Sequence, residues 1–147
     1  MRALSVLSIF FFSSVAAHAA SGGPDASGYR WVDSQEPGGP TFNYEAVNGS
    51  RVAFSDDSVS GPHPIGFSFR YYGQTYSQFW VSSNGFMTFT NNRNSGCCSG
   101  YALGGGRGYA AMIAGYWTDL LGSAGVYQTR GEAGRRVLVF QQQGREY

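Results

Sequence analysis

The stretch from Ile65 to Phe89 constrains the fold more than any other part of this chain. Its apolar residues alternate with polar ones at a period of two, which is the pattern of strands with one buried face. Tyr72-Gly73-Gln74 and Asn84-Gly85 divide the stretch into three such runs. Asn-Gly is well suited to two successive positive φ values, so we expect a type I′ hairpin turn at Asn84-Gly85. The stretch therefore predicts three consecutive antiparallel strands with an aromatic-rich buried face.

The first twenty residues have the features of a secretory signal peptide. Arg2 supplies a positive charge, Leu4 to Val15 is a largely apolar segment, and Ala17-His18-Ala19 has the small-x-small pattern that precedes cleavage. The apolar run is about twelve residues, which is short of the roughly 20 needed to span a bilayer. We therefore predict cleavage after Ala19 or Ala20, and a mature chain that is secreted, extracellular and without a membrane span.

The composition of the mature chain favours a sheet protein and excludes some partners. About 127 residues remain after cleavage, enough for one domain. The full chain has 22 glycines, 16% aromatic residues and only 13% charged residues, and its basic residues nearly balance its acidic ones. Because no basic face or run is present, we expect neither nucleic acid nor an anionic membrane as a partner.

Short strand-like runs separated by turn residues recur along the whole mature chain. Residues 21–28 are small and polar and predict a flexible lead-in, and residues 55–64 and 91–109 predict loops. Residues 110–121 have some helix propensity, but Gly115 and the β-branched and aromatic residues around it favour a strand. The candidate strands are residues 29–33, 42–47, 51–54, 65–69, 79–81, 86–89, 112–118, 125–129 and 136–142. The prediction is an all-β fold, an antiparallel β-sandwich of about nine short strands spanning residues 29–147.

Five phrases of the sequence resemble a module of bacterial secreted proteins related to the nidogen-like extracellular domain. They are YRWVDSQEPGGPTFNY, PIGFSFRYYGQTYSQFWVSSNGFMTF, GCCSG, MIAGYWTDL and GVYQTRGEAGRRVLVFQ, and they span about Gly28 to Tyr147. The resemblance implies a β-rich piece of a larger extracellular protein, with a role in adhesion or in matrix or cell-surface interaction. Modules of this group continue past the position of Gln141 with at least one more hairpin, so the resemblance also implies a truncated chain or a fragment.

Cys97-Cys98 is the most distinctive pair in the sequence. Export would place it where disulfides persist. A bond between neighbours is geometrically awkward, because a trans peptide holds adjacent Cα atoms about 3.8 Å apart, below the roughly 4.4 Å usual in disulfides. A vicinal disulfide, two free thiols, and bonds to partners outside this chain all remain open. We predict no metal, because no histidine or third cysteine lies nearby in the sequence to complete a ligand set.

The remaining candidate residues do not form a recognisable catalytic set. His63 lies in Gly-Pro-His-Pro, which predicts an exposed loop residue without a neighbouring nucleophile. Asp56, Asp57 and Asp119 are the best acidic candidates for calcium, but Asp56-Asp57 lacks the spaced acidic pattern of a calcium loop, and Asp119 is expected to cap a turn by accepting backbone N–H groups. We therefore predict no catalytic residue, no cofactor and no enzymatic activity.

Aromatic residues in the glycine-rich loop are the candidate ligand-binding groups. Most aromatic side chains lie at alternating positions that fill a sandwich core. Tyr101 and Tyr109 are set among glycines and are expected to be exposed. The sequence thus predicts a non-catalytic extracellular module that binds an unknown extracellular protein or glycan. The alternatives are a carbohydrate-binding module, which needs a planar row of exposed aromatics, or an accessory domain of a secreted hydrolase.

Overall fold

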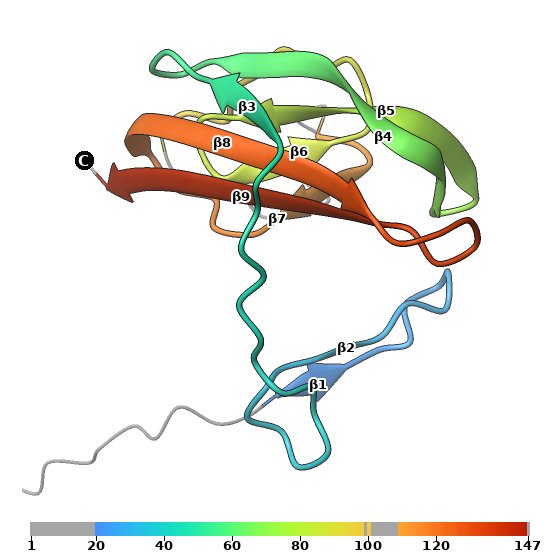
Figure 1. Cartoon of the computed structure of the whole chain (residues 1–147). Coiled ribbons are helices and arrows are strands. Elements are labelled where there is room, and N and C mark those ends of the chain that lie inside the picture. Colours follow the sequence, from blue (N-terminus) through green and yellow to red (C-terminus); the bar gives the residue numbers. More distant parts are fainter. Residues whose placement is uncertain (1–19, 99, 101–108, 147) are drawn as a thin grey trace, which may run out of the picture. The chain divides into compact units, whose positions relative to one another are not determined.

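The computed structural model describes residues 20–98, 100 and 109–146, and the described chain divides into two compact units, residues 1–43 and 44–147. All of the described secondary structure is β, as Figure 1 shows, so the predicted all-β class is confirmed. A search of these residues for a helix long and apolar enough to cross a membrane finds none.

The first unit contains a small two-stranded ribbon. β1 (Ser21–Gly22) pairs antiparallel with β2 (Trp31–Val32). Asp33 follows β2, and its carboxylate accepts hydrogen bonds from the backbone N–H groups of Ala20 at 2.8 Å and of Gln35 and Glu36 at 2.9 Å. These hydrogen bonds, the one from Ala20 foremost, hold the pKa of Asp33 below its usual value. Residues 21–22, predicted as part of a flexible lead-in, therefore lie in a strand.

The second unit is a sandwich of two antiparallel sheets. One sheet has the strand order β4-β5-β6-β7 and the other has the order β3-β8-β9. The bounds are β3 (Ser50–Ala53), β4 (Val59–Tyr71), β5 (Gln74–Ser82), β6 (Phe86–Thr88), β7 (Met112–Ala114), β8 (Leu120–Arg130) and β9 (Val137–Glu146). This arrangement agrees with the predicted antiparallel sandwich.

The core lies between the two sheets, and it is made by the alternation that the sequence shows. Ile65, Phe79 and Val81 are at most 1% exposed. Val52 and Phe89 complete the buried cluster. The sheets also meet through a polar contact, because the Thr129 hydroxyl donates a hydrogen bond of 2.5 Å to the carbonyl of Ile65. The pairing of the strands and the burial of their side chains therefore identify the same face of each strand as the one that points into the core.

Two tight turns connect the central strands, and they differ in kind. Tyr72 and Gly73, between β4 and β5, both have positive φ, as a type I′ turn requires. In the turn at residues 82–85, the N–H of Gly85 donates to the carbonyl of Ser82, and only Gly85 has positive φ. The predicted type I′ turn at Asn84-Gly85 is therefore wrong. Asn84 does not have a positive φ, and its side chain is buried and hydrogen-bonded inside the protein.

Some predicted element boundaries are also wrong. Residues 42–47 form no strand, and Asn48-Gly49 is no hairpin turn, because β3 pairs with β8. The side chain of Arg130, in β8, instead donates hydrogen bonds to the carboxylate of Glu45 and the carbonyl of Ala46.

The loop predicted for residues 55–64 and the strand predicted for residues 112–118 both prove shorter than expected. β4 already begins at Val59, and β7 ends at Ala114. The backbone N–H of Tyr116 then donates to the carbonyl of Gly85. This hydrogen bond holds the segment after β7 against the turn at residues 82–85.

Candidate functional site

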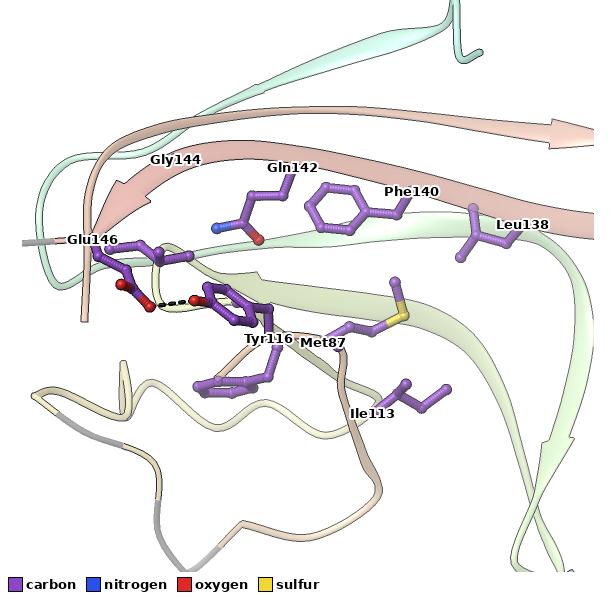
Figure 2. A pocket seen from close by; sticks show the side chains of 12 residues that line it. Met87, Ile113, Tyr116, Leu138, Phe140, Gln142, Gly144 and Glu146 are labelled. Atoms are coloured by element: carbon purple, nitrogen blue, oxygen red, sulfur yellow. Dashed lines mark hydrogen bonds between the residues drawn. The ribbon is translucent and has the colours of Figure 1, made fainter. Parts of the chain in front are cut away.

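A groove runs along one open side of the sandwich, between β6 and β7 of one sheet and β9 of the other. It has a volume of about 730 Å³, and Figure 2 shows its side chains pointing toward one another from the two sheets. Its lining residues are Gly85, Phe86, Met87, Ile113, Gly115, Tyr116, Leu120, Leu138, Phe140, Gln142, Gly144 and Glu146. We call this the edge groove. A second apolar pocket of about 260 Å³ shares Met87, Ile113 and Leu138 with it, so the two pockets adjoin at these three side chains.

The edge groove exists because the two sheets differ in strand number. Three strands oppose four, and β9 and β7 are the strands at the open edges of their sheets. Met87 pairs with Ile113 across β6 and β7, which places both side chains on the inner face. The side chain of Ile113 remains 45% exposed. Within the described residues, β9 has a paired strand on one side only, β8.

Polar groups mark the end of the edge groove nearest the end of β9. The Tyr116 hydroxyl donates a hydrogen bond to the Glu146 carboxylate, drawn as a dashed line in Figure 2. This hydrogen bond and the negative charge of Glu146 raise the pKa of Tyr116. Gln142, on the inner face of β9, donates a 2.6 Å hydrogen bond to the carbonyl of Ser83 in the turn between β5 and β6. The groove thus combines an apolar floor with a few fixed polar groups.

A buried polar cluster lies behind this end of the groove, centred on Asn84. The Asn84 side chain is fully buried, and its amide oxygen accepts the N–H of Leu120 at 3.0 Å. Its amide nitrogen donates to the Asp57 carboxylate at 2.7 Å. The Ser82 hydroxyl accepts the N–H of Asn84 and donates to the carbonyl of Ser95. One amide side chain therefore joins the loop before β4, the loop after β6 and the start of β8.

Cys97 and Cys98 are joined by a disulfide in the loop that follows β6. Cys97 is half-buried and Cys98 is exposed. The preceding Gly96 is fixed by two hydrogen bonds, one from its N–H to the Asn94 side chain at 3.1 Å and one from the Trp117 indole to its carbonyl at 3.0 Å. The Asp57 carboxylate lies beside the two sulfur atoms. The sequence gives no sign of this approach, because Asp57 is distant in the chain.

The two tyrosines proposed for ligand binding have different outcomes. Tyr101 lies outside the described residues. Tyr109 is half-buried, and its ring packs edge-on against Trp117 and Phe86, with centroids 4.8 and 5.9 Å away. The expectation that Tyr109 is exposed is therefore wrong.

His63 also differs from its prediction as an exposed loop residue. It lies in β4, half-buried, with its ring 5.4 Å from the ring of Phe79 and 5.3 Å from that of Tyr127. Burial lowers the pKa of its imidazole. Its Nε2 lies 3.1 Å from the Ser60 hydroxyl. A catalytic triad would also need a carboxylate to orient the ring, and the contacts of the His63 ring among the described residues are with Ser60, Phe79 and Tyr127.

Sequence reasoning missed Asn84 and Gln142 as contributors to these sites, and it considered Asp57 only as a calcium ligand. The V-S-S-N-G phrase did contain a signal, since two serines and an asparagine between two apolar strands have many hydrogen-bonding groups to satisfy if buried. Gln142 continues the alternation of Leu138 and Phe140, which predicts its inward position.

Comparison with known proteins gives one family. The sequence model of the family described as NIDO related matches residues 35–146, which includes the whole sandwich and excludes β1 and β2. No curated protein and no solved structure matches the chain significantly.

Proposed function

Because this chain belongs to the NIDO-related family, whose domains are extracellular modules, we propose that it is a non-catalytic extracellular binding module that captures an extended segment of a partner protein in the edge groove. The observation that carries this proposal is the mismatch of three strands against four. Among the described residues, the sheet β3-β8-β9 leaves the inner face of β7 open, and a fourth strand beside β9 would cover it.

The expected occupant follows from the groove's chemistry. The open edge of β9 offers backbone hydrogen-bonding groups along Val137–Glu146, and an extended peptide can pair with such an edge. Every second side chain of that peptide would then point into the edge groove, whose apolar side chains include Met87, Ile113 and Leu138. The partner segment is therefore about ten residues long, extended, and alternates apolar and polar residues, in keeping with the length of β9.

A glycan is less compatible with the edge groove than a peptide is. Sugar rings are bound by stacking on exposed, coplanar aromatic faces. Of the three aromatic residues that line the groove, Phe86 is buried and Phe140 is half-buried, so Tyr116 is the one exposed ring and forms no aromatic row. Tyr109, a candidate for such a platform, is packed against Trp117 and Phe86. Adhesion through a protein segment is thus the function that the geometry supports best.

The test is a selection of displayed ten-residue peptides on the purified chain. One library alternates apolar and polar residues, and the second has the same composition in scrambled order. We expect enrichment from the alternating library, and we expect the enriched peptides to slow hydrogen exchange of β9 amides, because pairing would bury the open edge. Glycans tested in parallel on an array are expected not to bind.

Two exposed apolar residues provide a matched pair of variants. Ile113 is 45% exposed in the edge groove, and Tyr72 is 47% exposed in the β4–β5 turn, where asparagine tolerates positive φ. Ile113→Asn should weaken peptide binding about fivefold, because burying the exposed half of an isoleucine contributes about 1 kcal/mol. Tyr72→Asn should leave binding unchanged. Equal effects of the two variants, or enriched peptides that protect no β9 amide, would refute the groove as the binding site.

A further inference from the structure

Three groups that can bind a metal ion converge beside the buried Asn84. The sulfur atoms of Cys97 and Cys98 and a carboxylate oxygen of Asp57 all lie within 4.8 Å of one another. In the part of the chain that the structure describes, this is the one place where three His, Cys, Asp or Glu side chains meet in this way. Asp57 precedes β4 and the cysteines follow β6, so the fold and not the sequence brings them together.

The spread of these atoms suits a tetrahedral ion. Zinc binds thiolate sulfur at about 2.3 Å and carboxylate oxygen at about 2.0–2.2 Å, so neighbouring ligand atoms in a tetrahedron are about 3.6–3.8 Å apart. Small side-chain shifts would bring Asp57, Cys97 and Cys98 to that spacing once the bond between the two sulfur atoms is broken. Three protein ligands leave the fourth position open to water.

Hydrogen bonds from neighbouring residues already hold the three ligands in position. The carboxylate of Asp57 accepts the 2.7 Å hydrogen bond from Asn84, whose own position is fixed by the N–H of Leu120. The backbone before Cys97 is held by the hydrogen bonds of Gly96 with Asn94 and Trp117. Hydrogen bonds of this kind keep metal ligands in place and raise affinity.

The charge of the cluster favours a metal ion over thiol catalysis. Reactive cysteines are activated by nearby positive charge, which stabilises the thiolate. Here the carboxylate of Asp57 lies within 4.8 Å of both sulfur atoms, and it repels a developing thiolate. A divalent cation would turn the mutual repulsion of three anionic groups into attraction.

We propose that Cys97, Cys98 and Asp57 form a redox-gated site for one thiophilic divalent ion of the zinc type. A small-molecule dithiol first supplies two electrons and two protons. The bond between the two sulfur atoms breaks, two S–H bonds form, and the dithiol becomes a cyclic disulfide. Zn²⁺ then displaces the two thiol protons, which pass to solvent, and is bound by both sulfur atoms and the Asp57 carboxylate. The disulfide form does not bind the ion, because its sulfur atoms carry no thiolate charge.

The experiment compares the oxidised chain with the chain reduced by dithiothreitol and separated from it under anaerobic conditions. Native mass spectrometry gives the number of zinc ions per chain, and competition with a chromophoric chelator gives the dissociation constant for Zn²⁺. We expect one zinc ion on each reduced chain and none on the oxidised chain. Near-ultraviolet circular dichroism checks that the reduced chain without zinc keeps its packed aromatic core.

Neighbouring aspartates provide the matched control. Asp57→Asn retains an oxygen that can accept the hydrogen bond from Asn84, and asparagine tolerates the positive φ of this position, but the charged ligand is lost. Asp56→Asn makes the same change of charge one residue away and outside the cluster. We expect Asp57→Asn to weaken zinc binding at least tenfold, Asp56→Asn to change it less than twofold, and the double substitution of both cysteines by serine to abolish it.

Three results would overturn the proposal. The first is a reduced chain that binds no zinc at one ion per chain. The second is an equal effect of Asp57→Asn and Asp56→Asn on zinc binding, which would show that Asp57 acts through its charge alone and does not bind the ion directly. The third is loss of the near-ultraviolet signal on reduction before zinc is added, since the site could not then be preformed by the fold.

Discussion

At the scale of single residues, Asn84 is the side chain on which most of the polar structure depends. It occupies a turn, where asparagine is usually exposed, yet it is fully buried and uses its oxygen for Leu120 and its nitrogen for Asp57. Buried amides are stable in proteins only when their groups are satisfied. The hydrogen bonds of the Asn84 side chain therefore fix the conformation of the turn at residues 82–85, together with the backbone preferences of its residues.

Asn84→Ala should destabilise the sandwich by about 2–3 kcal/mol, because it leaves the buried N–H of Leu120 without an acceptor and opens a small cavity. Urea unfolding followed by tryptophan fluorescence measures the free energy of unfolding. Asn91→Ala is the control, since Asn91 is exposed, and it should change that free energy by less than about 0.5 kcal/mol. A loss below about 1 kcal/mol for Asn84→Ala would show that water replaces the amide and that the cluster is not structural.

Asn84 also illustrates which kind of burial can be predicted from the sequence and which cannot. Alternation from Ile65 to Val81 predicts the buried face, because apolar burial leaves a period of two in the sequence. Polar burial leaves no such period, since its partners come from distant segments. The proximity of Asp57 to Cys97 and the inward positions of Tyr109 and His63 depend on pairings that only the assembled sheets define.

At the scale of elements, the long central strands were predictable and the short or irregular ones were not. β4 and β5 alternate clearly at Ile65–Phe69 and Phe79–Val81, and a Gly-containing turn lies between them. The segment at residues 42–47 has comparable alternation, but β3 pairs with β8 and not with this segment. The segment is instead contacted by the side chain of Arg130, which donates a hydrogen bond to Glu45. Local pattern therefore predicted that strands exist here, while competition for partners decided which segments became strands.

The β1–β2 ribbon gives a prediction about export. The backbone nitrogen of Ala20 lies 2.8 Å from the Asp33 carboxylate, and the carbonyl of Ala20 accepts the N–H of Asp33. Cleavage after Ala19 would convert that nitrogen into an ammonium group and strengthen the hydrogen bond by charge. Cleavage after Ala20 would remove both contacts. We therefore expect the secreted chain to begin at Ala20, and intact mass or N-terminal sequencing decides between this start and Ser21.

The role of Asp33 in this ribbon can be checked by its pH dependence. Its pKa is lowered from 3.8 by backbone hydrogen bonds, so its contribution is complete above about pH 4 and is lost as the pH falls through the lower, folded-state value. The protection factors of the Ser21 and Gly22 amides, taken relative to the intrinsic exchange rate at each pH, should fall over that range in the native chain and show no such transition in Asp33→Asn. The amide of Phe79 in the core reports on general acid unfolding and should remain protected throughout. A transition in Asp33→Asn as well would assign the effect to another carboxyl group.

At the scale of the whole molecule, stability is concentrated in the second unit. The buried apolar cluster and both sheets of the sandwich belong to residues 44–147. The first unit has one ribbon of two-residue strands, and a pair of that size is not stable in water by itself. The family match nevertheless begins at residue 35, before the sandwich. Residues 35–43 therefore belong to the family's pattern without belonging to the core of the fold.

Removal of residues 1–43 should leave a chain that still folds, because every residue of the buried cluster remains and Glu45 keeps its 2.8 Å ion pair with Arg130. We expect one cooperative urea transition, with a free energy of unfolding within about 0.5 kcal/mol of that of the mature chain. Removal of residues 1–53 is the control, since it also deletes β3, whose Val52 is 3% exposed in the core, and it should abolish the cooperative transition. If the shorter deletion lowers the unfolding free energy by more than about 1 kcal/mol, the first unit stabilises the sandwich and the two units form one folding domain.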